Sequence, residues 1–154
     1  NRQVISLSGD GGFTMMMGEM LTLKQLNLPI KIFVFNNEEL SFIAMEMKAS
    51  GYLDYATDFV NPDFGKLAEA AGIKGVSIQN SSEVDEKIME ALNHNGPVIV
   101  NVRVDKQELA MPPKIAYQQA KGFSKYLINA ILDGRGTELK EMAKTNWMKY
   151  KSLF

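Results

Sequence analysis

Two short polar segments, Gly-Asp-Gly-Gly at residues 9–12 and Asn-Asn at residues 36–37, carry the side chains best suited to bind a divalent cation and an anion. Asp10 offers a carboxylate and Asn37 an amide oxygen, and hard cations such as Mg²⁺ take oxygen ligands of both kinds. The glycines leave the backbone bare just ahead of a predicted helix, where free N–H groups and the helix dipole attract phosphate. Because Asp-Gly turns are common, the prediction depends on where the fold places the two segments.

Each polar segment follows an apolar run of strand-forming residues. Residues 4–8 and 30–35 are short and rich in β-branched or aromatic side chains, as buried strands are. Residues 13–26 lie between them and have helical character. A strand, a helix and a second strand form a crossover with parallel strands, whose carboxyl ends share the sheet edge where α/β proteins bind ligands. We therefore expect Asp10 and Asn37 to lie close together at this edge.

The chain then continues to alternate between strands and helices. Strands are expected at residues 75–79 and 98–104, and helices at residues 40–49, 63–71 and 82–93. Gly72 and Gly96 are suited to end the second and third of these helices, and Ser81 or Ser82 to cap the third. This alternation predicts an α/β fold with a three-layer, doubly wound parallel sheet.

A helical segment is expected beyond the sheet. A Pro-Pro pair at residues 112–113 interrupts the alternation, and helices are predicted at residues 115–132 and 137–150. We therefore divide the chain into an α/β domain at residues 1–105, which holds the candidate site, and a C-terminal helical tail at residues 106–154.

The composition excludes several classes of site. The chain has 154 residues with 45 % hydrophobic side chains, enough for one globular domain with a core. It has no cysteine, which excludes disulfides, thiolate ligands and cysteine nucleophiles, and its single histidine, His94, excludes a multi-histidine zinc site. No run approaches the about 18 apolar residues of a membrane-spanning helix. The first strand starts almost at once after Asn1, so we expect this chain to be part of a longer polypeptide.

Charge is divided unevenly along the chain. Residues 1–120 carry 10 basic and 15 acidic side chains, whereas residues 121–154 carry 7 and 3. The acidic body has no stripe of basic residues interleaved with aromatic ones, so we expect no nucleic-acid partner. The basic end coincides with the predicted C-terminal helices.

The last predicted helix has an apolar stripe framed by lysines. Its apolar members recur at steps of three and four: Leu139, Met142, Ala143, Trp147, Tyr150 and Phe154. The framing lysines are Lys140, Lys144, Lys149 and Lys151. Such a helix either packs on its own domain, with its lysines solvated, or lies at the surface of an anionic membrane.

Longer blocks of the sequence resemble one enzyme family. A Gly-Asp-Gly followed by a helix and a strand that ends in Asn-Asn is the signature of the diphosphate-binding domain of thiamine-diphosphate enzymes. The wider sequence resembles the C-terminal part of the pyruvate oxidases, most of all the quinone-reducing, membrane-associated type. The blocks that carry this resemblance are SGDGGFTMMMGEML, LPIKIFVFNN, FIAMEMKASGYLDYATDF, AKGFSKYL and GRGTELKEMAKTNW.

The resemblance implies a role for each residue of the polar segments. Asp10 and Asn37 would ligate Mg²⁺ through side-chain oxygens, and Glu39 through its backbone carbonyl. The residues implied to surround the diphosphate of thiamine diphosphate are Asp10, Gly11, Gly12, Asn37, Glu38, Glu39, Leu40 and Ser41.

Two residues of the following helix are implied to act in catalysis. Phe42 matches an aromatic residue that lies near the thiazolium ring and assists electron transfer to flavin. Glu46 falls one helical turn later, so both side chains can point into one cleft. The residues alone leave two other interpretations open, a core position for Phe42 and a solvated charge for Glu46 beside Lys48.

The resemblance also implies partners that this chain does not supply. Such enzymes convert pyruvate to acetate and carbon dioxide with thiamine diphosphate, Mg²⁺ and FAD, and pass the electrons to a membrane quinone. FAD is held mainly by a domain absent from this chain, and the carboxylate that activates the thiamine cofactor comes from a neighbouring subunit. We therefore expect a homo-oligomer of at least two subunits, with a homotetramer favoured, and no activity from this chain alone. The tail of the quinone-reducing enzymes binds lipid, which implies a cytoplasmic protein peripheral to the inner face of the cell membrane.

Other functions fit parts of the same pattern. A phosphate- and oxygen-dependent pyruvate oxidase that makes acetyl phosphate, or an acetolactate synthase that joins two carbon units, would keep the same cofactor site. A phosphate-binding module without catalysis, built on a flavodoxin-like sheet, would make the pairing of Asp10 with Asn37 incidental. The basic tail argues against the two alternative enzymes.

Overall fold

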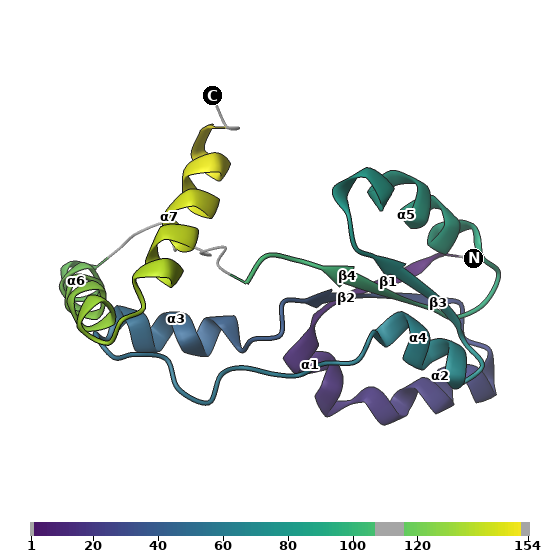
Figure 1. Cartoon of the computed structure of the whole chain (residues 1–154). Helices are drawn as coiled ribbons and strands as arrows, with labels where there is room; N and C mark the ends of the chain where they lie inside the picture. Colours follow the sequence, from purple (N-terminus) through teal and green to yellow (C-terminus); the bar gives the residue numbers. More distant parts are fainter. Residues whose placement is uncertain (1, 107–115, 152–154) are drawn as a thin grey trace. The chain divides into compact units, whose positions relative to one another are not determined.

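The centre of the fold is a four-stranded parallel sheet. In the computed structural model, which describes residues 2–106 and 116–151, the strands lie in the order β1, β2, β4, β3 (Figure 1). Their bounds are β1 (Val4–Gly9), β2 (Ile30–Asn36), β3 (Lys74–Ile78) and β4 (Val98–Arg103). All three neighbouring pairs run parallel, which confirms the predicted α/β class.

Helices cover both faces of this sheet and make the three predicted layers (Figure 1). One face packs against three helices through Val34 and Ile99, and the opposite face packs against one helix through Phe33 and Val100. Val34 and Phe33 are consecutive, so the alternation of side chains along β2 supplies both cores. The helices are α1 (Asp10–Met15), α2 (Met20–Leu26) and α4 (Phe64–Ala70) on the first face, and α5 (Val84–Asn93) on the second.

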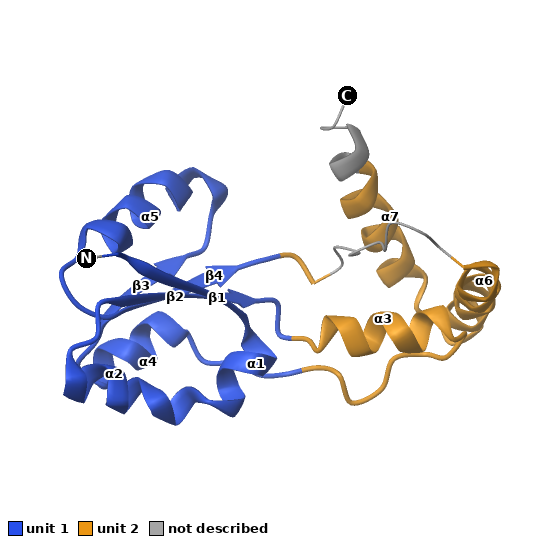
Figure 2. Ribbon diagram, turned by 180° about the vertical axis from the view of Figure 1, so that it is seen from behind, with its two compact units in different colours: residues 1–38, 59–104 blue, residues 39–58, 105–154 orange. Residues whose placement is uncertain are grey.

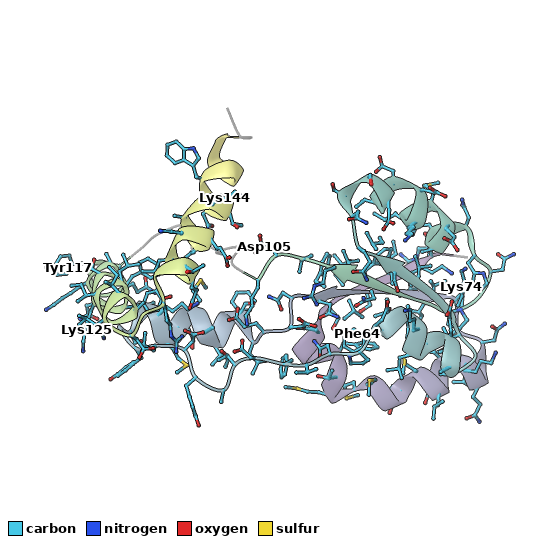
Figure 3. The ribbon with its side chains drawn as sticks, viewed as in Figure 1. Phe64, Lys74, Asp105, Tyr117, Lys125 and Lys144 are labelled. Carbon is cyan, nitrogen blue, oxygen red and sulfur yellow. The ribbon has the colours of Figure 1, made fainter. Side chains whose placement is uncertain are left out.

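Aromatic packing fixes the layer of α1 and α4 onto the sheet. Phe64 is fully buried at the start of α4 and lies between this helix and the sheet (Figure 3). Its ring meets the ring of Phe13 edge to face, with centroids 5.1 Å apart. The contact holds α1 close to the carboxyl end of β1, where the first polar segment lies.

The first strand differs from the buried strand that its composition predicts. Among the strands that the structure describes, β1 pairs with β2 alone and forms an edge of the sheet. Leu7 is 70 % exposed, and Val4 and Ile5 are about half exposed. Strand-forming side chains therefore specify the backbone of β1, whereas its burial depends on neighbours that composition does not reveal.

The helix predicted at residues 13–26 begins earlier and is interrupted. α1 starts at Asp10, because the carboxylate of Asp10 accepts the N–H of Gly11 within the first turn, at 2.8 Å. Met16 then leaves the helical region, with φ −119° and ψ 15°. A 3₁₀ turn, η1 (Met17–Glu19), connects α1 to α2.

Two of the three predicted helix ends need correction. Gly72 follows the last turn of α4 at φ +75°, as predicted. Gly96 does not end α5, because the chain is already extended at His94, with φ −70° and ψ 134°. Neither Ser81 nor Ser82 is the cap, because the 3₁₀ turn η2 (Ser81–Glu83) that leads into α5 starts after Asn80.

The chain separates into two compact units (Figure 2). Unit 1 comprises residues 1–38 and 59–104 and contains the sheet, and unit 2 comprises residues 39–58 and 105–154. The predicted division lies between residues 105 and 106, whereas the chain last passes between the units after residue 104, and residues 39–58 belong with the C-terminal segment. The Pro-Pro pair at residues 112–113 lies outside the described residues.

Unit 2 has its own small core. It contains α3 (Ser41–Ala49), α6 (Tyr117–Leu132) and α7 (Gly136–Lys151). The core residues are Tyr126, Ala130 and Met142, with Leu53, Phe123, Leu127 and Leu139 packed against them. Within the described parts of the chain, none of the helices has both the length and the apolar character that crossing a membrane requires.

The apolar stripe predicted on the last helix is divided by this packing. Leu139 and Met142 face the core of unit 2, whereas Ala143 is exposed and Trp147 is 73 % exposed. The side chains of Lys149, Tyr150, Lys151 and Phe154 lie outside the described residues. Leu139 and Met142 thus follow the packing interpretation, whereas Ala143 and Trp147 do not.

Candidate functional site

The carboxylate of Asp10 is the centre of the candidate site in unit 1. The residue is only 3 % exposed and lies directly after β1. Oδ1 accepts the N–H of Gly11 at 2.8 Å, and Oδ2 accepts the N–H of Glu38 at 2.7 Å and the side-chain amide of Asn61 at 2.8 Å. Three N–H donors suit an ionised carboxylate, which accepts hydrogen bonds only.

The bond from Glu38 brings the second polar segment onto Asp10. β1 and β2 are neighbours in register from Val4 with Ile30 to Gly9 with Phe35, so both chains leave the sheet at the same edge. The peptide N–H between Asn37 and Glu38 then points at the carboxylate of Asp10. The predicted proximity of the two segments is therefore present in the structure.

Glu38 makes the bend that this arrangement needs. Its φ is +60°, a left-handed conformation that side chains other than glycine seldom adopt. The turn is held by the carbonyl of Glu38, which accepts the N–H of Phe59 at 2.8 Å, and by the carboxylate, which pairs with Arg103 at 2.7 Å. Strained backbone of this kind is common at functional sites.

A chain of three side-chain amides, two of them buried, leads to Asp10. Asn36 donates from its side chain to Asn101 Oδ1 at 3.0 Å, and Asn61 donates to Asn36 Oδ1 at 3.1 Å. Because Asn61 also donates to Asp10, each amide fixes the orientation of the next. We call Asn101, Asn36 and Asn61 the amide chain.

The sequence predictions missed Asn61, Asn101 and Arg103. Asn101 carried a usable signal, because it is a lone amide within the otherwise apolar run of residues 98–102. Asn61 precedes a proline and resembles an ordinary loop residue. Its part in the site depends on a contact between segments far apart in the sequence, which no local pattern shows.

The glycines have different environments. Gly11 is buried, and its N–H is already bonded to Asp10. Gly12 is exposed, and a side chain there would meet only Ser8 Oγ, at 3.7 Å. The bare backbone predicted for anion binding is therefore found at Gly12 more than at Gly11.

The other predicted site residues belong to unit 2. Glu39 is buried and forms an antiparallel bridge with Asp58, and the N–H of Leu40 donates to Thr57 O at 2.8 Å. Burial raises the pKa of the Glu39 carboxyl, although Lys48 and Lys106 counteract the shift. Ser41 is the first residue of α3.

The two residues implied to act in catalysis share the outer side of α3. Phe42 is 73 % exposed, which excludes the core position that the residues alone left open. Glu46 is also exposed and lies one turn later. Ala44 and Lys48 form the buried side of the same helix.

The donor set in unit 1 fits Mg²⁺ bound with phosphate. Among the described residues, no three His, Cys, Asp or Glu side chains gather as a metal cluster. What the edge offers is one carboxylate at Asp10, the amide of Asn37 and backbone groups, an oxygen donor set that hard cations prefer. Mg²⁺ usually completes such a set with water and phosphate oxygens.

A parallel α/β sheet with polar groups at the carboxyl ends of β1 and β2 is the class of fold that binds its ligands at this edge. Residues 1–102 match the family described as thiamine pyrophosphate enzyme, C-terminal TPP binding domain. The chain belongs to this family. Membership indicates an enzyme that depends on thiamine diphosphate, and gives no support to a module without catalysis on a flavodoxin-like sheet.

Individual relatives extend this finding. The chain is 38 % identical over 144 residues to the putative thiamine pyrophosphate-containing protein YdaP of Bacillus subtilis, which covers 94 % of this chain and 25 % of that protein. It is 37 % identical over 110 residues to the mitochondrial acetolactate synthase catalytic subunit of Saccharomyces cerevisiae, covering 71 % of this chain and 16 % of that protein. The large subunit of Escherichia coli acetolactate synthase isozyme 2 is 33 % identical over 114 residues, or 73 % of this chain and 21 % of that protein. The chain thus spans a quarter or less of the length of these relatives.

Proposed function

We propose that this chain is the diphosphate- and Mg²⁺-binding part of a thiamine-diphosphate-dependent pyruvate oxidase. Pyruvate and water would give acetate and carbon dioxide, and the two electrons would pass through FAD to a membrane quinone. The observation that carries the proposal is the buried carboxylate of Asp10, held by Gly11, Glu38 and Asn61 at the sheet edge. Such a carboxylate, facing bare backbone and an amide, suits a cation bound together with a diphosphate.

Different residues would bind the metal ion and the diphosphate. Asp10 and Asn37 would hold Mg²⁺ through side-chain oxygens, and Glu39 through its backbone carbonyl. The backbone around the diphosphate would come from Gly11, Gly12, Glu38, Leu40 and Ser41. Thiamine diphosphate, when bound, supplies the nucleophilic carbon that permits loss of carbon dioxide from a 2-oxo acid. The chain itself anchors and orients that group.

Phe42 and Glu46 would serve the oxidation. An exposed aromatic ring on α3 suits a contact with cofactors held by other parts of the protein. Glu46, one turn away, would hold or move a proton beside it. FAD would be bound mainly by a domain outside this chain, and a site completed by a neighbouring subunit requires at least a dimer, with a homotetramer expected.

Acetolactate synthesis is the second candidate function. Relatives named acetolactate synthase from yeast and Escherichia coli favour it. Their matches cover 71 % and 73 % of this chain, whereas the match to YdaP covers 94 % and so includes most of the C-terminal helices. An oxidase with a functional C-terminal segment fits this difference in coverage better.

We also propose that unit 2 contacts anionic lipid at the inner face of the cell membrane, in a cytoplasmic protein. α6 exposes Ile128, Ile131 and Leu132 at steps of three and four, and α7 exposes Trp147. Lys125 and Lys144 extend from these helices (Figure 3). Apolar side chains among lysines suit a membrane surface that contains anionic lipid.

The reaction can be tested with the full-length protein that contains this chain. With pyruvate, thiamine diphosphate, Mg²⁺ and a quinone, the oxidase should release acetate and reduce the quinone. Acetolactate formed without quinone reduction would establish the second candidate instead, and acetyl phosphate formed with oxygen and phosphate would identify the oxygen-dependent oxidase.

Lipid binding needs a separate test. Co-sedimentation with phosphatidylglycerol vesicles should be lost when Ile131→Glu and Leu132→Glu are combined. The matched control is Leu21→Glu, which alters an exposed leucine of unit 1. Equal sedimentation of both variants would exclude α6 as the lipid-binding surface.

A further inference from the structure

Unit 2 contains a cluster of charged and polar side chains that the proposed binding roles do not use. It joins five segments of the unit: α3, the loop after it, α6, the turn between α6 and α7, and the start of α7. The members of this C-terminal charge cluster are Lys48, Asp54, Tyr126, Arg135 and Glu138. Lys48 is on α3, the helix of Phe42 and Glu46.

Lys48 is the most buried of the charged residues in the cluster. Its side chain is 6 % exposed, and its Nζ lies 3.1 Å from Glu138 and 3.9 Å from Asp54. The ammonium group also lies over the ring of Tyr126, 5.6 Å from the centroid. A buried lysine is costly unless it is paired, and Glu138 is its nearest partner.

Glu138 contacts three other members of the cluster. It accepts a hydrogen bond from the hydroxyl of Tyr126 at 3.1 Å and lies 3.8 Å from Arg135, which pairs with Asp54 at 2.9 Å. Burial, together with Glu138, raises the pKa of Tyr126, so its hydroxyl stays a donor. Within the cluster two cations thus face two carboxylates, and Arg135 also pairs with the exposed Asp133 at 3.1 Å.

The backbones of α6 and of the end of α3 are also closely packed. A Cβ built on Gly122 would lie 1.9 Å from the carbonyl oxygen of Ala49, so only glycine fits there. Asn129 donates to the carbonyl of Gly51 at 3.2 Å. α3 has nine residues, fewer than the about 12 that an isolated helix needs for marginal stability in water. Its stability must therefore come from packing.

We propose that Glu138, through Lys48, makes α6 and α7 the support that positions α3, so that the C-terminal helices control the placement of Phe42 and Glu46. The part that concerns these two residues rests on the proposed function. The sequence predicts a C-terminal tail, whereas in the structure this segment packs with α3 in one unit.

Hydrogen exchange in the full-length protein tests the support directly. Glu138→Ala should speed exchange of the amides at residues 42–49 by at least about tenfold, since it leaves a buried lysine poorly paired. Glu138→Gln keeps the shape and should give a smaller effect in the same amides. Glu141→Gln changes an exposed glutamate of the same helix and should leave the exchange of the amides at residues 42–49 unchanged.

Two outcomes would overturn the proposal. Unchanged exchange of α3 in Glu138→Ala would show that the pair does not hold the helix. Equal acceleration in β2 and β4 would show a general loss of stability instead of a local role. If Glu138→Ala fails to fold, Glu138→Gln and the double variant Lys48→Met with Glu138→Met decide the question. The apolar pair of the double variant should restore the protection of α3 from exchange that is lost when only the charge of Glu138 is removed.

A kinetic measurement distinguishes a positioning role of Glu138 from a purely structural one. It also tests this role separately from the proposed function. Glu138→Gln should lower kcat for pyruvate while the affinity for Mg²⁺ with thiamine diphosphate stays within about twofold. A loss of cofactor affinity as large as the loss of kcat would contradict a role limited to Phe42 and Glu46, because Ser41 at the start of α3 is among the residues proposed around the diphosphate. If the full-length protein does not oxidise pyruvate, the proposed function fails, but hydrogen exchange still decides whether Glu138 supports α3.

Discussion

The side-chain amide of Asn61 donates to Oδ2 of Asp10 at 2.8 Å, across a separation of 51 residues in the sequence. The same amide donates to Asn36, so its orientation is fixed before any ligand arrives. If the amide were reversed, its oxygen would face the carboxylate. Asn61 thus determines which way the acidic group of the candidate site points.

Asn61→Ser should therefore weaken binding of thiamine diphosphate with Mg²⁺. A free carboxylate would sample other orientations, and we expect about a tenfold loss of affinity, the size of one hydrogen bond to a charged group. Titration calorimetry of the full-length protein measures it. Asn95→Ser, an exposed asparagine of the same unit, is the matched control. Equal affinities of the two variants would contradict the role of Asn61.

Asp10 and Glu39 should respond differently to removal of their side chains. Asp10→Ala should abolish Mg²⁺-dependent binding of thiamine diphosphate, because the carboxylate is the only charged side-chain ligand proposed. Glu39→Gln should bind within about twofold of the wild-type protein, because ligation by Glu39 would use a backbone carbonyl. Calorimetry with and without Mg²⁺ distinguishes the two. A large loss in Glu39→Gln would mean that its carboxylate is a ligand.

The raised pKa of Glu39 predicts a pH dependence of folding stability. Its ordinary value is 4.5, and burial makes the folded protein hold the proton more tightly than the unfolded chain does. Stability from this group is complete below pH 4.5 and is lost as the pH rises through the raised folded pKa. Urea unfolding at several pH values should show a shallower decline in Glu39→Gln than in the wild type. Parallel curves would remove Glu39 as the cause.

Lys31 tests how much the hydrogen bonds of a buried lysine contribute to the stability of the fold. Its Nζ donates to the carbonyls of His94 at 2.7 Å and Gly96 at 2.6 Å, and burial lowers its pKa. Lys31→Met would leave the two carbonyls without this donor, which destabilises the fold, but it would also remove the penalty of burying a charge. We expect a net loss of about 1–3 kcal/mol in the free energy of unfolding.

Lys74→Met is the matched control for this change. Lys74 and Lys31 both stand opposite Val98 in the sheet, but Lys74 pairs with Glu90 at a partly exposed position. Such a surface pair contributes at most about 1 kcal/mol. Urea unfolding should therefore show the larger loss for Lys31→Met, and an equal loss would refute the carbonyl explanation.

Local patterns account for most of what the sequence could predict. The sequence predicts Asp10 and Asn37 as neighbours because each directly follows a strand, and parallel strands share an edge. The three layers follow from alternating strands and helices. The start of α1 at Asp10 was missed because two glycines disfavour a helix, whereas the bond from Gly11 to the Asp10 carboxylate stabilises its first turn.

What the sequence could not predict depends on distant contacts. The amide chain joins Asn36, Asn61 and Asn101 from three separate segments. Lys31 looks like an exposed residue of an alternating strand, yet it is buried beneath the turn that Gly96 makes. The division into units was missed for the same reason, because only the packing of α3 on α6 reveals it.

The polypeptide passes between the two units three times, after residues 38, 58 and 104. A recombination point at residue 104 would therefore separate α3 from α6 and α7, although it lies at the end of the sheet. A chimera of two relatives would put Gly122 of one parent against the counterpart of Ala49 from the other. Exchange of the C-terminal helices between family members should succeed only when residues 39–58 are exchanged with them.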